Sequence, residues 1–189
     1  MDRNIKTKIF EEVRKNQTPM DYNTNDEPIL YQLSDRTISI LTNRLRDEYT
    51  AHYYYRAAAN WCGDMNYKKA AAYFTAEANT ELTHAEGIQK YMVDFNIIPE
   101  ILKTNSVHQF NDLTEVVYGA YEMELALMKA YNKDSQSILI EDITTFDFLT
   151  EYRKTQKESV IEYNDLINAI NLIDKNDKFQ VLYFEQTYF

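Results

Sequence analysis

The chain has 189 residues with only three glycines and three prolines, which favours long helices over a β-sandwich or a glycine-rich nucleotide-binding fold. Its formal net charge of −10 argues against a nucleic-acid partner or an anionic membrane surface, and a negative surface attracts cations. The single cysteine, Cys62, excludes an intrachain disulfide and a paired-cysteine metal site, and no apolar run reaches membrane-spanning length. Because the first residues also lack a signal-peptide pattern, we expect a cytoplasmic all-α protein.

The first part of the chain differs from the rest. Residues 3–16 have the pattern of a short amphipathic helix, and residues 17–29 are rich in Pro, Asn, Asp and Thr, which is typical of a linker. We therefore predict an N-terminal extension over 1–33 and one helical domain over 34–189. The extension is interpreted either as a flexible tail or as a helix that docks on a partner or a sister subunit.

Four long helices follow, predicted over 34–62, 66–95, 111–131 and 143–173. Ser34 and Asn111 are the expected N-caps, and Gly63-Asp64 is the expected break after the first helix. The first and third connections are short, so each helix pair is expected to form an antiparallel hairpin. The connection over 96–110 is long enough to cross the whole bundle. This order predicts a four-helix bundle of two hairpins joined by one long crossover.

The apolar stripe of each predicted helix is interrupted near its middle by a polar side chain. These residues, one or two from each helix, are Glu48, Glu81 with His84, Glu124 and Gln156. A buried carboxylate costs several kcal/mol unless a cation neutralises it, and Arg153 is the only stripe cation near this level. Glu81 and His84 are spaced i, i+3 and share one helix face. An oxygen-rich donor set of this kind suits a pair of iron or manganese ions.

Simpler interpretations exist for each residue taken alone. A Glu-x-x-His pair on a helix is commonly incidental, and Glu48 with His52 can form a local helix pair. Cys62 is expected to be a small core residue, and the sixteen tyrosines are expected mainly to pack. Tyr55 lies two turns from Glu48 on the same face. Whether His52 or Glu77 joins the site is left open.

Four segments carry a family pattern: LTNRLRDEYTAHYYYRAAANWC, TELTHAEGIQKYM, AYEMELALMKAYN and TFDFLTEYRKTQKE. With the late LYF at 182–184, they resemble the ferritins, especially the non-haem bacterial type, over about 34–186. The resemblance implies a ferritin-like four-helix bundle with a short fifth helix. It also implies a di-iron ferroxidase site whose residues are Glu48, Tyr55, Glu81, His84, Glu124 and Gln156.

The resemblance further implies an iron-storage protein that oxidises Fe(II) with O2 or H2O2, in a homo-oligomeric cage of 24 subunits. Glu81 would bridge two ions, with Glu48 and His84 on the first and Glu124 and Gln156 on the second. Tyr55 would hydrogen-bond a ligand or donate an electron. No haem is expected, because Leu82 stands where a bacterioferritin has its haem-ligating Met.

Departures from the pattern keep other functions open. The positions of a third bacterial iron site are Thr80, Thr155, Glu158 and Ser159, and only Glu158 is a carboxylate, so this site is expected to be absent or weak. The alternative is a di-iron oxidase or peroxide scavenger without large-scale storage. A third hypothesis is a non-enzymatic assembly protein, which retention of all five metal-site residues disfavours.

Overall fold

The computed structural model describes residues 31–104 and 109–189, of which Gln32–Phe189 form one compact unit. The helix predicted over 3–16 and the linker predicted over 17–29 lie outside the described residues. In the described part the helices are α2 (Asp35–Asp64), α3 (Lys68–Asp94), α4 (Leu113–Ile138), α5 (Ile143–Ile170) and α6 (Lys178–Tyr188), and there is no strand. None of these helices is long and apolar enough to cross a membrane.

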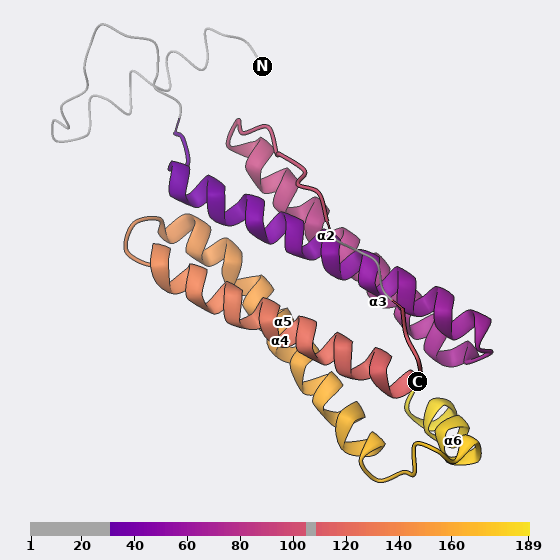
Figure 1. Ribbon diagram of the computed structural model, residues 1–189. Coiled ribbons are helices and arrows are strands. Elements are labelled where there is room, and N and C mark those ends of the chain that lie inside the picture. The colour runs from indigo at the N-terminus through magenta and orange to yellow at the C-terminus, as the bar shows by residue number, and fades with distance from the viewer. Residues whose placement is uncertain (1–30, 105–108) are drawn as a thin grey trace, which may run out of the picture. The chain divides into compact units, whose positions relative to one another are not determined.

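The helices form the predicted bundle of two hairpins. α2 packs along α3, α4 packs along α5, and α2 also contacts α4 (Figure 1). The described parts of the connection from α3 to α4 follow the side of α2, where Phe110 packs edge-on against Tyr54 and Trp61. The expected fold class, an all-α ferritin-like bundle with a short C-terminal helix, is confirmed.

Side-chain caps begin three of the long helices. Ser34, as predicted, accepts a hydrogen bond from the backbone N–H of Thr37 at 3.1 Å. The third long helix starts one residue later than expected, because Asp112, and not Asn111, accepts from the N–H of Glu115 at 2.8 Å. Asp142 does the same for Thr145 at 2.9 Å.

Several helix ends differ from the sequence prediction by one to seven residues, most clearly the ends of α2 and α4. α2 continues through Gly63 to Asp64, and the left-handed residue that ends it is Asn66, with φ of 65°. Asparagine tolerates this conformation because its short amide side chain bonds locally. α4 extends to Ile138, seven residues beyond the predicted end, since Ser135 and Ile138 continue its buried stripe through a polar stretch.

α6 is tied to the first turn of α3 by one buried carboxylate. Glu185 Oε1 accepts hydrogen bonds from the backbone N–H groups of Lys69 at 2.7 Å and Ala70 at 3.1 Å. These N–H groups have no partner within α3, and the carboxylate also faces the positive end of the helix dipole. The last helix therefore stabilises the start of the helix that carries two predicted site residues.

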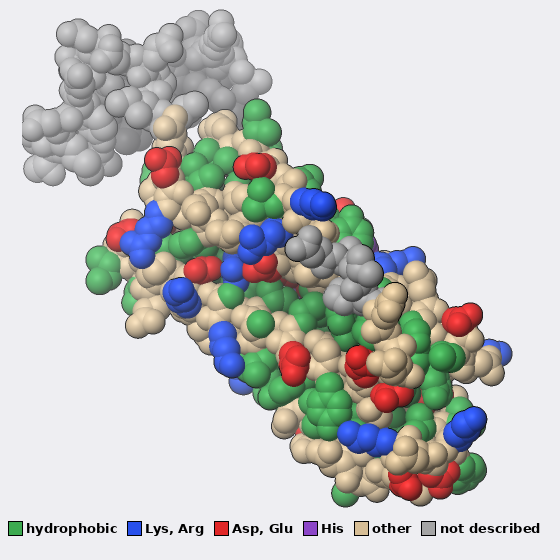
Figure 2. Space-filling model, in the orientation of Figure 1, with side chains coloured by type: hydrophobic (Ala, Val, Ile, Leu, Met, Phe, Trp, Pro, Cys, Tyr) green, Lys and Arg blue, Asp and Glu red, His purple; other side chains and the backbone are tan. Residues whose placement is uncertain are grey.

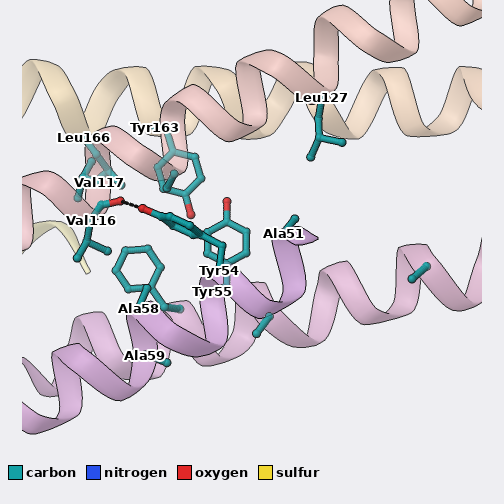
Figure 3. Packing of buried hydrophobic residues seen from close by; sticks show 14 of the residues in the cluster. Ala51, Tyr54, Tyr55, Ala58, Ala59, Val116, Val117, Leu127, Tyr163 and Leu166 are labelled. Carbon is teal, nitrogen blue, oxygen red and sulfur yellow. Dashed lines mark hydrogen bonds between the residues drawn. The ribbon is translucent and has the colours of Figure 1, made fainter. Parts of the chain in front are cut away.

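Alanines on α2 let the tyrosines of the core enter the bundle. Ala51, Ala58 and Ala59 are buried beside Tyr54 and Tyr55, and the phenol of Tyr54 donates to the carbonyl of Val116 at 2.7 Å (Figure 3). On the visible outer face, acidic and basic side chains are interspersed (Figure 2). Most of the buried side chains are aromatic or aliphatic, and several of the buried polar ones gather at the level described next.

Candidate metal centre

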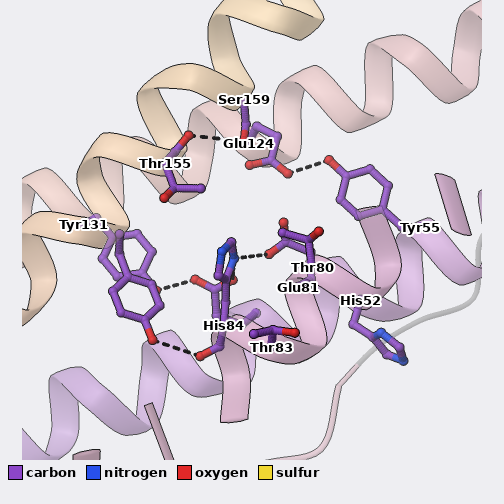
Figure 4. Close-up of polar contacts among 12 residues, drawn as sticks. His52, Tyr55, Thr80, Glu81, Thr83, His84, Glu124, Tyr131, Thr155 and Ser159 are labelled. Atoms are coloured by element: carbon purple, nitrogen blue, oxygen red, sulfur yellow. Dashed lines mark hydrogen bonds and ion pairs between the residues drawn. The ribbon is translucent and has the colours of Figure 1, made fainter. Parts of the chain in front are cut away.

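Four helices contribute polar side chains to one level of the bundle interior. Glu48 comes from α2, Glu81 and His84 from α3, Glu124 from α4 and Gln156 from α5 (Figure 4 labels Glu81, His84 and Glu124). All are at most 2% exposed apart from His84, whose side chain is 19% exposed. The interruptions that the sequence shows in its apolar stripes are therefore buried.

The α2–α3 half of this site is the more tightly gathered. One potential ligand atom from each of Glu48, Glu81 and His84 lies within 4.8 Å of the other two. Nδ1 of His84 lies 3.2 Å from Oε2 of Glu81 and 3.6 Å from Oε2 of Glu48. Two carboxylates and an imidazole at this separation can grip one divalent cation.

The α4–α5 half holds a carboxylate and an amide. The phenol of Tyr55 donates a hydrogen bond to Oε1 of Glu124 at 2.5 Å (Figure 4). Oε2 of Glu124 and Oε1 of Gln156 are buried and accept no hydrogen bond from any residue in 31–104 or 109–189. The same holds for Oε2 of Glu48. Buried oxygens without a donor are costly, and a bound cation would supply what they lack.

Charge interactions within the α2–α3 cluster shift the pKa values of its three side chains. Burial alone would lower the pKa of His84, but its interactions with Glu48 and Glu81 outweigh burial and raise that pKa to about 10. Burial would raise the pKa of Glu48, yet the contact with His84 lowers it. Burial raises the pKa of Glu81 well above its usual range. A proton on His84 therefore provides the positive charge that a cation would provide.

In the α4–α5 half the titratable ligand candidate is Glu124, and its pKa is raised. Burial raises the pKa of Glu124 to about 7, although the hydrogen bond from Tyr55 opposes the shift. The charge of Glu48 raises it further, which places the two halves within electrostatic reach of each other. Near neutral pH the metal-free Glu124 is thus partly protonated.

The two residues left open by the sequence lie outside the three-residue cluster. The ring of His52 turns to the backbone of α3, with Nδ1 2.6 Å from the carbonyl oxygen of Ala78, and it lies apart from His84 (Figure 4). Glu77 is partly buried, and desolvation and the charge of Glu162 raise its pKa to about 7. Cys62 is buried and unpaired, as expected of a core residue.

Sequence reasoning missed one contact. Tyr131, interpreted as a packing residue of α4, donates a hydrogen bond from its phenol to Oε1 of Glu48. The spacing along the sequence could have indicated this contact, because Tyr131 follows Glu124 by seven residues just as Tyr55 follows Glu48. Seven residues are about two helical turns, so each tyrosine shares a face with its glutamate.

The sequence of this chain is similar to those of known ferritins. The sequence profile of the ferritin-like domain matches residues 38–173. The bacterial non-heme ferritin of Campylobacter jejuni is 26% identical over 146 residues, covering 76% of this chain and 87% of that protein. That of Escherichia coli O6:H1 is 25% identical over 154 residues, covering 80% and 92%.

Solved structures agree on the fold. An open-pore ferritin from the archaeon Archaeoglobus fulgidus superimposes with a TM-score of 0.78 at 18% identity, covering 84% of this chain and 98% of that one. A humanised archaeal ferritin gives 0.74 at 20% identity, covering 83% and 96%. With a profile match over more than two thirds of its length, this chain belongs to the ferritin family.

Proposed function

We propose that this protein is an iron-storage ferritin that oxidises Fe(II) to Fe(III) at a di-iron site inside the bundle and deposits the product as a mineral. The supporting observation is the set of buried oxygens on Glu48, Glu124 and Gln156 that accept no hydrogen bond from the described residues. They lie at the level of Glu81 and His84, and together they form the donor set that ferrous ions require. Membership of the ferritin family supports iron storage and ferroxidase activity in general.

Each half of the site would hold one ferrous ion, and Glu81 would bridge the two. Glu48 and His84 complete the first ion, and Glu124 and Gln156 hold the second. Two ferrous ions supply two electrons, enough to reduce O2 to H2O2 or H2O2 to water. Tyr55 orients Glu124 through its hydrogen bond, so that the other oxygen of Glu124 is left for the ion.

Proton release accompanies binding at the first half. With a pKa of about 10, His84 carries its proton at neutral pH when no metal is bound. A cation that takes Nδ1 as a ligand must displace that proton, and the two neighbouring carboxylates then neutralise the cation instead. The bundle otherwise surrounds the site with aromatic and aliphatic side chains, which limits access of bulk water.

Storage requires a cavity that a single bundle does not have. We propose that copies of the ferritin-like domain, residues 34–189, assemble into a homo-oligomeric cage of 24 subunits. The net charge of −10 per chain favours entry of cations into such a shell. Membership of the ferritin family, whose bacterial members match this chain over most of their length, supports a homo-oligomer.

A di-iron oxidase or peroxide scavenger without storage is the second candidate. The observation in its favour concerns the positions expected for a third iron site. There the hydroxyl groups of Thr80, Thr155 and Ser159 (labelled in Figure 4) donate to carbonyl groups of their own helices. Glu158 is exposed. These positions give the site no further buried carboxylate through which oxidised iron would leave.

An aerobic ferrous titration of the purified chain separates the two candidates. Iron that is oxidised and stays soluble would be counted per chain, and the mass of the assembly would be measured by light scattering. Uptake far beyond about two ions per chain, by a particle of 24 chains, is the expected result for a storage protein. Oxidation that stops near two ions per chain would favour the oxidase, and no accelerated oxidation would contradict both.

A further inference from the structure

The metal centre contains two reciprocal tyrosine–glutamate pairs. Tyr55 of α2 donates to Oε1 of Glu124 on α4, and Tyr131 of α4 donates to Oε1 of Glu48 on α2. Both tyrosines are completely buried. Each follows the glutamate of its own helix by seven residues and bonds the glutamate of the other helix. The two hydrogen bonds thus run in opposite directions between α2 and α4, so that each helix supplies one tyrosine and one glutamate.

Each pair leaves one carboxylate oxygen of its glutamate without a hydrogen-bond donor among residues 31–104 and 109–189. One carboxylate oxygen accepts the phenol, and the other, Oε2, is buried and accepts no hydrogen bond from the described residues. Oε2 of Glu48 is also the oxygen that lies 3.6 Å from Nδ1 of His84. The phenol of Tyr131 therefore occupies the oxygen of Glu48 that is not needed for the His84 cluster.

The ring of Tyr131 is itself held in place. It stacks on Tyr152 with centroids 5.4 Å apart and 23° between the planes, and the guanidinium carbon of Arg44 lies 5.6 Å from its centroid. Arg44 is fixed by Asp134 at 3.3 Å and by Asp47 at 2.8 Å. A ring held by these two contacts cannot easily turn its phenol away from Glu48.

Tyr152, which stacks on Tyr131, also contacts His84. Its phenol donates to the backbone carbonyl of His84 at 3.0 Å, and its ring lies edge-on to the imidazole with centroids 5.7 Å apart. One aromatic stack thus contacts both Glu48 and His84. No such contact joins it to Glu124, which depends on Tyr55 instead.

We propose that Tyr131 is a positioning residue that makes Glu48 a one-oxygen ligand of the ion shared with His84. Tyr55 acts in the same way on Glu124, so that a separate tyrosine governs each of the two ions. The inference rests on the proposed di-iron site. Loss of the Tyr131 phenol would let Glu48 rotate or bind through both oxygens, and it would weaken the first ion selectively.

Cobalt(II) is a suitable probe, because it binds oxygen and nitrogen ligands without being oxidised by air under mild conditions and has visible absorption that reports its ligands. Binding to the full-length chain would be followed by calorimetry and by absorption. The variant His84→Ala identifies which binding step belongs to the α2–α3 half. Tyr54→Phe is the matched control, because it removes a buried phenol that donates to a backbone carbonyl away from the site.

We expect Tyr131→Phe to weaken the His84-dependent step about tenfold and to change its absorption, while the other step moves by less than about threefold. Tyr55→Phe should show the opposite selectivity, and Tyr54→Phe should alter neither step. The metal-free melting temperature of all three phenylalanine variants would be measured alongside. A purely structural role predicts a lower melting temperature with unchanged cobalt affinities.

Two results would overturn the inference. One is wild-type affinity and absorption at both steps in Tyr131→Phe. The other needs no variant: a crystal structure of the cobalt-loaded wild-type chain in which Glu48 binds through both oxygens or Tyr131 has left it. In either case a wild-type chain that still binds two ions and oxidises iron keeps the proposed function. A wild-type chain that does neither removes the function and the inference together.

Discussion

The two halves of the candidate metal centre, one on each helical hairpin, differ in charge. The α2–α3 half presents Glu48, Glu81 and His84 within 4.8 Å of one another, whereas the α4–α5 half presents Glu124 and the neutral amide of Gln156. In each half one buried glutamate accepts a hydrogen bond from a tyrosine phenol: Glu48 in the first half and Glu124 in the second. The difference predicts that the proposed di-iron site holds its two ions with unequal strength.

Unequal strength suits a site through which iron passes. An ion held by two carboxylates and an imidazole is retained more firmly than one held by a shared carboxylate, Glu124 and an amide. We therefore expect the first ion to bind before the second and the second to leave first. Four experiments test this comparison.

Removing Glu81 should have the largest effect, because this carboxylate is the one proposed to bind both ions. We expect Glu81→Ala to slow the rapid phase of Fe(II) oxidation by at least about 100-fold, measured by stopped-flow absorption of the ferric product. Glu86→Ala is the control, since Glu86 is an exposed carboxylate on the same helix. A rapid phase unchanged in Glu81→Ala would exclude Glu81 as a shared ligand.

Adding a carboxylate to the weaker half should make the halves alike. Gln156→Glu is expected to tighten the second metal-binding step about tenfold, because a charged ligand replaces a neutral one in a buried position. Calorimetry with cobalt(II) measures the step, and turnover of iron into the soluble ferric pool should slow. Gln136→Glu adds the same charge at an exposed position of α4 and should change neither quantity. Equal tightening by both variants would point to net charge alone.

Without metal, the stability of the chain should fall as the pH rises. Burial raises the pKa of Glu124 to about 7, and a carboxyl group with a raised pKa stabilises the folded chain only while it is protonated. That contribution is complete below pH 4.5 and is lost as the pH rises through 7. The proton on His84, with a pKa of about 10, is lost in the same direction at higher pH.

We expect the metal-free melting temperature to drop on the order of 5 °C between pH 5.5 and 8. Glu124→Gln should show a smaller drop, because it removes one titrating group. Saturating zinc(II) should reverse the slope, since its ligands must lose their protons to bind. A melting temperature that rises with pH in the metal-free chain would contradict the assignment.

The contact between α6 and α3 should matter for stability and very little for the site. Glu185→Ala removes the acceptor of two backbone N–H groups, and we expect a loss of about 1 kcal/mol, or roughly 2–4 °C in melting temperature. Glu185→Gln keeps an acceptor oxygen and should lose less. Cobalt affinities should stay within about threefold of the wild type. A larger change would show that α6 influences the ligands on α3.

The sequence was most informative where a strong physical rule applied. A carboxylate or amide in the middle of an apolar stripe is expected to be buried, and Glu48, Glu81, Glu124 and Gln156 are buried as that rule predicts. The connection lengths predicted the hairpins and the crossover. That these residues bind metal stays a prediction.

The sequence was least informative about helix ends and about contacts between helices. Gly63 and Asn66 are both able to end α2, and in the structure Gly63 stays helical while Asn66 takes the left-handed conformation. The polar run after Tyr131 hides the buried Ser135 and Ile138 that extend α4. The hydrogen bond from Tyr131 to Glu48 depends on the distance between two helices, which spacing along one helix does not give.

The protonated His84 has a consequence for the rate of metal capture. Because its charge holds the side chains of Glu48 and Glu81 close to it before any ion arrives, the first half is preorganised. An incoming ion therefore meets a formed set of ligands and spends little conformational entropy in assembling them. Entry of the first ion should then be limited by its own dehydration and by departure of the proton, rather than by motion of the helices.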